Sequence, residues 1–187
     1  MSIPGAFLFV LLAMVRIVGI LDGGFTLLGA LLFAQASLAA LLMIFRRTGR
    51  LVAPKWVQMA SWLSAILPML FFTPARPAWQ GLLPVPGLAL NVWALAALGT
   101  AFGISPAYRG LVTSGPYRWL RHPMYAGELL SLTGAFAAAA LPLNLAILLA
   151  FTASILWRIG WEERILKCNG YPGYANIVRW RLVPGIW

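Results

Sequence analysis

The chain has 187 residues, of which 61% are hydrophobic and 10% are charged. Soluble domains contain about 45–50% apolar and about 25% charged residues, so this composition excludes an ordinary soluble domain and indicates a single integral membrane domain. The net charge of +10 suggests anionic partners, but the chain lacks the soluble mass of a nucleic-acid-binding surface. We therefore expect the basic residues to mark cytoplasmic loops near lipid headgroups. Separately, the single Cys and the single His argue against a metal site.

Six apolar runs follow one another along the chain, at residues 4–21, 25–45, 56–74, 87–103, 123–140 and 145–167. As helices, such runs come close to the length that crosses a hydrocarbon core of about 30 Å. The pattern predicts an all-α, polytopic membrane protein with about six transmembrane helices. Pro123 favours the first position of the fifth helix, where its missing N–H costs nothing, and residues 22–24 and 141–144 predict turns. Arg16, inside the first run, either reaches the interface or faces an internal polar cavity.

The distribution of basic residues predicts the topology. Twelve of the fourteen lie in the connections 46–55 and 104–122 and in the part of the chain from Arg158 onward, whereas Arg76 lies on the other side of the predicted membrane. With six spans, the positive-inside rule places both termini in the cytoplasm, and we expect the inner membrane. Five spans would place the N-terminus outside and keep the other polar segments cytoplasmic. We expect the first span to be retained, because no basic region precedes it.

Polar side chains concentrate in two segments, residues 109–128 and residues 158–164. Arg158 and Glu162 are four residues apart on the sixth predicted helix, so they share one face. They either form an intrahelical ion pair, or they face a pocket in which Arg158 holds a substrate anion and Glu162 accepts hydrogen bonds from a ligand. His122 is likewise either a loop hydrogen-bonding residue or part of that pocket. The residues alone leave both interpretations open.

Four sequence elements of the second half carry a resemblance to a known family: Leu111-Val-Thr-Ser-Gly-Pro-Tyr117, Arg121-His-Pro-Met-Tyr125 with Gly127, Glu162-Glu163, and Gly170…Tyr174…Pro184-Gly-Ile-Trp187. In this combination, over roughly residues 90–187, the chain resembles the isoprenylcysteine carboxyl methyltransferases and their bacterial relatives. The resemblance divides the single domain, 1–187, into N-terminal helices, 1–86, and a methyltransferase-like part, 87–187. Sterol and steroid reductases carry a similar Arg-His-Pro-x-Tyr element, so an NADPH-dependent oxidoreductase is an alternative, as is a non-catalytic protein of the same fold.

The resemblance implies a methyltransferase that uses S-adenosyl-L-methionine, bound in a cytoplasmic-side pocket that the C-terminal tail caps. It implies cofactor contacts from Gly110, Leu111, Val112, Tyr117, His122, Pro123, Tyr125 and Glu162. It assigns Arg158 to the substrate and, together with Glu162, to catalysis. The implied acceptor is a small or lipid-like molecule with a carboxylate or another nucleophile, which reaches the pocket from the bilayer. The chain departs from family members at Phe102 and Ile177, which bears on the substrate more than on the cofactor.

Overall fold

The computed structural model describes residues 2–72, 78–167 and 170–187, and this part of the chain is helical, without a β-strand. The α-helices are α1 (Ser2–Gly23), α2 (Leu27–Phe45), α3 (Lys55–Ile66), α4 (Val85–Leu98), α5 (Pro123–Ala138), α6 (Pro142–Leu166) and α7 (Tyr171–Ile177). Four 3-10 turns extend or join them: η1 (Leu67–Leu70), η2 (Ala78–Leu82), η3 (Gly99–Ala101) and η4 (Gly115–Arg118). The predicted all-α class is confirmed.

The helix boundaries follow proline and glycine. Helix α5 begins at Pro123, as predicted. Helix α6 begins at Pro142, so the predicted turn at 141–144 was wrong: Pro142 occupies a first-turn position, where it suits a helix start. Helix α1 runs through the first two residues of the predicted turn at 22–24, and the chain turns at Gly24, whose φ of 84° suits glycine. The sequence did not predict helix α7 in the C-terminal segment.

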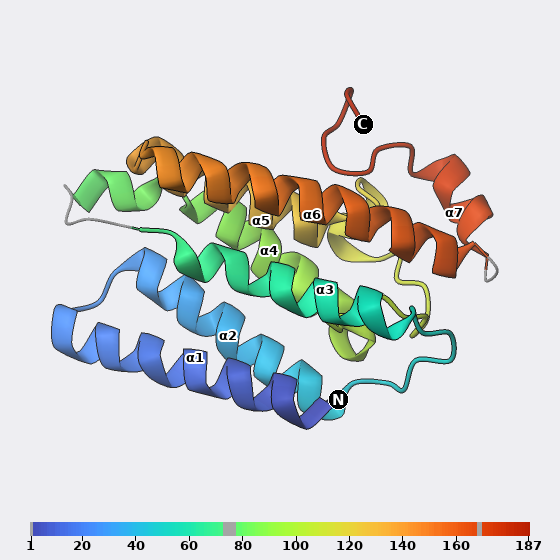
Figure 1. Ribbon diagram of the computed structural model, residues 1–187, viewed down its shortest axis with the longest axis horizontal. Helices are drawn as coiled ribbons and strands as arrows, with labels where there is room; N and C mark the ends of the chain where they lie inside the picture. The colour runs from blue at the N-terminus through green and yellow to red at the C-terminus, as the bar shows by residue number, and fades with distance from the viewer. Residues whose placement is uncertain (1, 73–77, 168–169) are drawn as a thin grey trace.

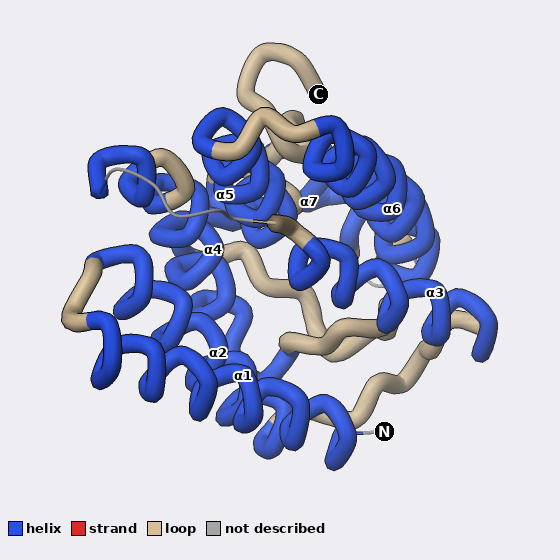
Figure 2. Tube along the Cα trace, turned by 60° about the vertical axis from the view of Figure 1, so that its left-hand side comes forward, coloured by secondary structure: helices blue, strands red, loops and turns tan. Residues whose placement is uncertain are grey.

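The helices lie side by side, with their long axes roughly parallel (Figure 1). Helix α1 packs against α2, α2 against α4, α4 against α5, and α6 against α3 and α5. The N-terminus, the connection between α2 and α3 and helix α7 lie at the same end of the molecule. Figure 2 shows the same helices surrounding the long non-helical segments that join them. This end, which carries most of the loop mass, holds the candidate site.

Two glycines allow α4 and α5 to approach backbone to backbone. A Cβ on Gly87 would lie 2.1 Å from the backbone N of Ser131, and a Cβ on Gly127 would lie 2.6 Å from the backbone N of Asn91. Small residues permit such close contact between membrane helices. The Asn91 side chain, which is buried, donates from Nδ2 to the Met124 carbonyl at 3.1 Å. This contact fixes the start of α5, from which several site residues project.

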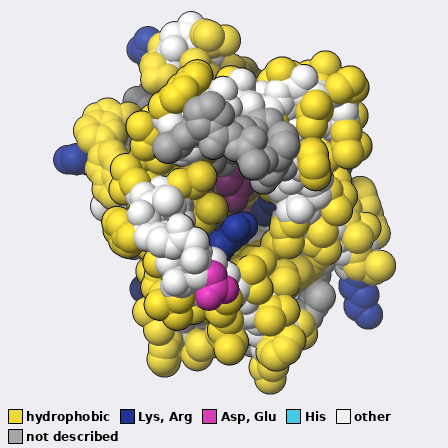
Figure 3. All heavy atoms as spheres, turned by 90° about the vertical axis from the view of Figure 1, so that its left-hand side faces the viewer, with side chains coloured by type: hydrophobic (Ala, Val, Ile, Leu, Met, Phe, Trp, Pro, Cys, Tyr) yellow, Lys and Arg dark blue, Asp and Glu magenta, His cyan; other side chains and the backbone are white. Residues whose placement is uncertain are grey.

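The outer surface suits lipid. Large apolar side chains are exposed along α1 and α2, among them Phe7 at 69% and Leu41 at 52%. Figure 3 shows that hydrophobic side chains also cover most of the end opposite α7, around a central hollow in which acidic and basic side chains are visible. Such a surface would aggregate in water, whereas a bilayer accommodates it. The protein is an integral membrane protein, as the composition predicts.

Four described segments are long and apolar enough to cross a membrane by length and composition: Ile3–Gly23, Leu27–Phe45, Trp79–Ala101 and Pro142–Leu166. The 16 residues of α5 extend over only about 24 Å, less than a core of about 30 Å. Helix α3 is shorter still, and η1 continues it from Leu67. The number of six spans therefore stays a prediction. Arg16 is exposed on the outside of α1, so it does not face an internal cavity.

Candidate active site

The α4–α5 connection, residues 99–122, forms one wall of the site. Gly110 and Gly115 have φ values of 107° and 59°, and the segment between them makes no helix. The connection is held against the α2–α3 connection, residues 46–54, by backbone hydrogen bonds such as Tyr108 N to Leu51 O at 2.8 Å. The N-terminal helices therefore position the wall of a site to which they contribute no lining side chain in the described residues.

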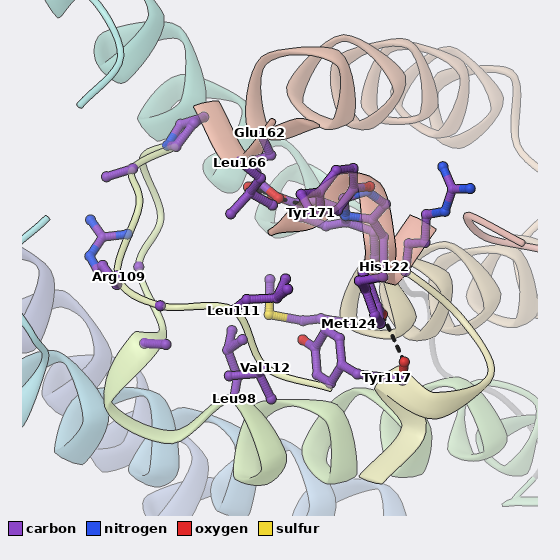
Figure 4. A pocket seen from close by; sticks show the side chains of 18 of the residues that line it. Leu98, Arg109, Leu111, Val112, Tyr117, His122, Met124, Glu162, Leu166 and Tyr171 are labelled. Atoms are coloured by element: carbon purple, nitrogen blue, oxygen red, sulfur yellow. Dashed lines mark hydrogen bonds and ion pairs between the residues drawn. The ribbon is translucent and has the colours of Figure 1, made fainter. Parts of the chain in front are cut away.

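A cavity lies between this connection, the end of α6 and the tail, defined here as residues 170–187. The residues that line it come from all three elements, from the last residue of α4 and from the first turn of α5: Leu98, Ala101, Gly103, Ser105, Pro106, Ala107, Arg109, Gly110, Leu111, Val112, Tyr117, Arg121, His122, Met124, Tyr125, Glu162, Leu166, Tyr171 and Tyr174. Figure 4 shows Leu98 and Val112 on one side of this space and Glu162, Leu166 and Tyr171 on the other. Of the predicted cofactor contacts, all but Pro123 line this cavity.

The polar corner of the cavity is built from α5 and α6. The Tyr125 hydroxyl donates to Glu162 Oε1. His122 Nδ1 lies 3.7 Å from Glu162 Oε2, and the His122 ring stacks on that of Tyr125 with centroids 5.9 Å apart. Tyr125 is 2% exposed, and the Glu162 side chain is 22% exposed. A carboxylate that is partly open to the cavity is thus held in place by two buried neighbours.

Arg158 lies beneath Tyr125, outside the residues that line the cavity. Its guanidinium is 4.9 Å from the centroid of the Tyr125 ring, and Nη2 donates to the Ile104 carbonyl at 2.7 Å. Among the described residues no ion pair within 4.0 Å joins Arg158 to Glu162, so the intrahelical pair considered from the sequence is absent there. The buried Nε of Arg158 has no hydrogen-bond partner in the described part of the chain.

Glu163, which the sequence left without a role, connects the tail to the site. It accepts from Arg181 Nε at 2.8 Å and Nη2 at 2.9 Å, and from the Tyr171 hydroxyl at 2.7 Å. Arg121 Nη1 and His122 Nε2 each lie 3.5 Å from Glu163 Oε1. The sequence signal was the Glu-Glu pair itself, since successive residues of a helix face different neighbours.

Arg121 and Tyr174 complete the attachment of the tail. Arg121 donates from Nε to Val178 O and from Nη2 to Ala175 O, both at 2.7 Å. The Tyr174 hydroxyl donates to Tyr117 O at 2.7 Å, and both residues line the cavity. The tail therefore covers the cavity through side chains that bind backbone carbonyls.

The tyrosines around the cavity remain neutral at physiological pH. Burial raises the pKa of Tyr174 to about 12 and raises that of Tyr117 further. Burial also raises the pKa of Tyr171, and its hydrogen bond to Glu163 adds to this effect. These phenols present donors and aromatic faces to the cavity, and they add no negative charge beside Glu162.

Arg109 is a cation in the cavity wall that the motifs did not predict. Burial is the main cause that lowers its pKa, with the nearby Arg46 charge second. Its Nη atoms reach the Ser105 carbonyl only at 3.4 and 3.5 Å, and its buried Nε has no partner among the described residues. The hydrogen-bonding capacity of the Arg109 guanidinium is therefore only weakly satisfied, and the group is available to bind an anion.

Comparison with known proteins identifies the catalytic class. Residues 81–169, from η2 to beyond the end of α6, match the family model of phospholipid methyltransferases. A search of curated proteins found no significant match. The matched segment contains the α4–α5 connection, the start of α5 and the Glu162–Glu163 pair, and the family includes the isoprenylcysteine carboxyl methyltransferase-like enzymes, so the resemblance seen in the motifs is confirmed. The match of residues 81–169 to this family model indicates a membrane methyltransferase.

Proposed function

We propose that the protein transfers a methyl group from S-adenosylmethionine, bound in the cavity beneath the tail, to a carboxylate or another nucleophile of a small or lipid-like acceptor. Methyltransferases of this family generally use this donor. The cavity lies at the end that carries the α2–α3 connection and the tail, where most basic residues are found, and the positive-inside rule favours a cytoplasmic position for this end.

The observation that carries the proposal is an unpaired stretch of backbone opposite a carboxylate. Gly110, Leu111 and Val112 line the cavity, and no described group pairs with their backbone N–H groups. Backbone polar groups in folded proteins are normally paired, so such an edge beside a cavity favours a polar ligand. Glu162 from α6 lines the same cavity, and Figure 4 shows its side chain across from Leu111.

The charges fit the two ends of this donor. S-adenosylmethionine, when bound, supplies an electrophilic methyl group on a positively charged sulfur. The Glu162 carboxylate suits the positive and hydroxyl-bearing parts of the molecule, and the weakly satisfied Arg109 suits its carboxylate. Tyr117, Tyr171 and Tyr174 offer aromatic surface and lie where the tail closes the cavity.

For the acceptor, we infer that Arg158 supplies the anchoring charge. Arg158 lies beneath Tyr125 rather than in the cavity wall, so the anionic group of the acceptor would have to pass the Tyr125 ring to reach it. Its buried Nε has no partner in the described structure, which is costly unless such a group binds there. A carboxylate acceptor needs only to be oriented toward the methyl group, whereas an amine or thiol acceptor must also lose a proton. His122 and Glu162, which both line the cavity, are the candidates to accept that proton. The tail excludes water from this reaction.

Isothermal titration of the purified protein tests the site. We expect S-adenosylhomocysteine to bind and NADPH not to bind. Glu162→Gln removes a charged hydrogen-bond acceptor worth about 1.5–3 kcal/mol, so affinity should fall roughly 10- to 150-fold. Asp22→Asn, which removes a carboxylate from the far end of α1, is the matched control and should leave the affinity unchanged. Binding of NADPH alone would favour the reductase alternative, and unchanged affinity of Glu162→Gln would contradict the assignment of Glu162.

The acceptor is identified by mass spectrometry of membrane lipids from cells with and without the protein. We expect a species heavier by one methyl group that disappears when Arg158 is replaced with Gln. A methylated species that persists in the Arg158→Gln cells would contradict the anchoring role of Arg158.

A further inference from the structure

A second hollow, outside the cavity, lies between η4 and the tail. Arg118 and Trp119 form one side, and residues 177–180 with Pro184 form the other. None of these residues lines the first cavity. We call this hollow the tail groove.

The tail groove is formed by segments outside the four candidate spans: Arg118 and Trp119 belong to the α4–α5 connection, and residues 177–184 belong to the tail. The Trp119 and Trp93 rings form a T-shaped pair with their centroids 5.6 Å apart. Trp93 belongs to the candidate span Trp79–Ala101 and is 46% exposed. Tryptophan favours the boundary between hydrocarbon and headgroups. The groove therefore adjoins the exposed surface of a candidate membrane span through Trp119 and Trp93.

The tail groove carries positive charge that the protein does not neutralise. Arg118 lies over the Trp119 ring at 5.1 Å, and among the described residues no carboxylate lies within 4.0 Å of Arg118 or Arg179. The chain has four acidic residues, none of which lines the groove. Beside these cations, Trp119 is 55% exposed and Ile177 is 83% exposed. A ligand for this surface needs an anionic head and an apolar body.

We propose that the tail groove binds one anionic phospholipid, with its phosphate between Arg118 and Arg179 and its chains against Ile177 and the exposed ring of Trp93. Guanidinium groups bind phosphate through paired hydrogen bonds, and indole rings suit the glycerol level of the bilayer. Since Val178, in the groove wall, also accepts from Arg121, the bound lipid would hold the tail against the α4–α5 connection.

Native mass spectrometry of the full chain in mixed micelles tests this. With equal phosphatidylglycerol and phosphatidylcholine, we expect the wild type to retain phosphatidylglycerol preferentially. Arginine near an anionic lipid surface contributes a factor of about five each, so Arg118→Gln with Arg179→Gln should reduce the preference by roughly tenfold or more. The control pair, Arg50→Gln with Lys55→Gln, removes the same charge from exposed positions outside the groove and should retain the preference.

Three results would overturn the proposal: no preference in the wild type, an equal loss in the control pair, or displacement of the lipid by free glycerol phosphate, which would indicate a site for soluble anions. Fluorescence provides a readout that does not depend on the arginine variants. Brominated phosphatidylglycerol bound in the tail groove should quench the fluorescence of Trp119. The part of the quenching that disappears in Trp119→Phe should therefore be greater with brominated phosphatidylglycerol than with brominated phosphatidylcholine. Equal losses would also overturn the proposal. None of these measurements depends on methyl transfer, so they are independent of the proposed function.

Discussion

Replacing Glu163 with Gln should detach the tail but leave in place the side chains that would bind the cofactor in the cavity. Glu163 accepts three hydrogen bonds from the tail at 2.7–2.9 Å, two from Arg181 and one from Tyr171. Gln has the same shape and keeps one acceptor oxygen, but it has no charge to offer either arginine that faces it. Glu163 does not line the cavity, whereas its neighbour Glu162 does. The two adjacent carboxylates should therefore give separable effects.

The magnitude follows from the exposure of the partners. Hydrogen bonds to charged groups contribute about 1.5–3 kcal/mol each, and exposed ion pairs contribute less because solvent screens them. The Glu163 side chain is 12% exposed, but that of Arg181 is 32% exposed, so its contribution is discounted. We estimate a loss of about 2–3 kcal/mol in tail docking, which corresponds to roughly a 30- to 150-fold increase in the tail-opening equilibrium.

Hydrogen exchange with mass spectrometry measures this opening. The backbone N–H groups of Arg121 and His122 donate to the tail carbonyls of Trp180 and Arg181 at 2.9 and 3.0 Å, so they report tail docking directly. In Glu163→Gln, peptides that contain Arg121 and His122, and those of the tail, should exchange faster, whereas α4 and α5 should not change. Glu162→Gln is the control: it should weaken cofactor binding and leave tail exchange intact. Unchanged exchange in Glu163→Gln, or equal acceleration in both variants, would refute the reasoning.

Three further substitutions test the packing. Gly127→Val should lower the thermal unfolding midpoint in detergent, because a Cβ there would lie 2.6 Å from backbone and overpacking costs about 1–3 kcal/mol. The control Gly160→Val, at a position with open space, should not lower the midpoint. Equal midpoints for the two variants would contradict the close approach of α4 and α5. Asn144→Ala should cost about 2–4 kcal/mol in unfolding experiments, because this fully buried amide of α6 makes two hydrogen bonds with the backbone of Phe72, after η1, and one with that of Ala139, after α5; a loss below 0.5 kcal/mol would show that water replaces them. Tyr174→Phe should accelerate tail exchange about fivefold, because a carbonyl at 2.7 Å loses its donor; no acceleration would mean that this bond does not hold the tail.

Much of the fold was predictable because each long helix corresponds to a local sequence pattern. The apolar runs indicated the six long helical segments, and Pro123 indicated where α5 begins. The errors are also local: Pro142 starts α6 instead of ending a turn, and Pro68 lies where the α3 run passes into η1. A proline is compatible with the first turn of a helix as well as with a turn, so composition alone does not distinguish the two.

The sequence by itself determined the membrane class, the order of the helices and the methyltransferase family, because hydrophobicity and contiguous motifs are properties of neighbouring residues. Through the resemblance to family motifs, it also indicated seven of the nineteen residues that line the cavity. Only the tertiary structure decided that Arg158 lies beneath Tyr125 rather than in the cavity wall, and that Glu163 holds the tail. The bond from Arg121 to Val178 spans 57 residues. Such contacts depend on how helices pack and where a loop turns, which no local pattern encodes.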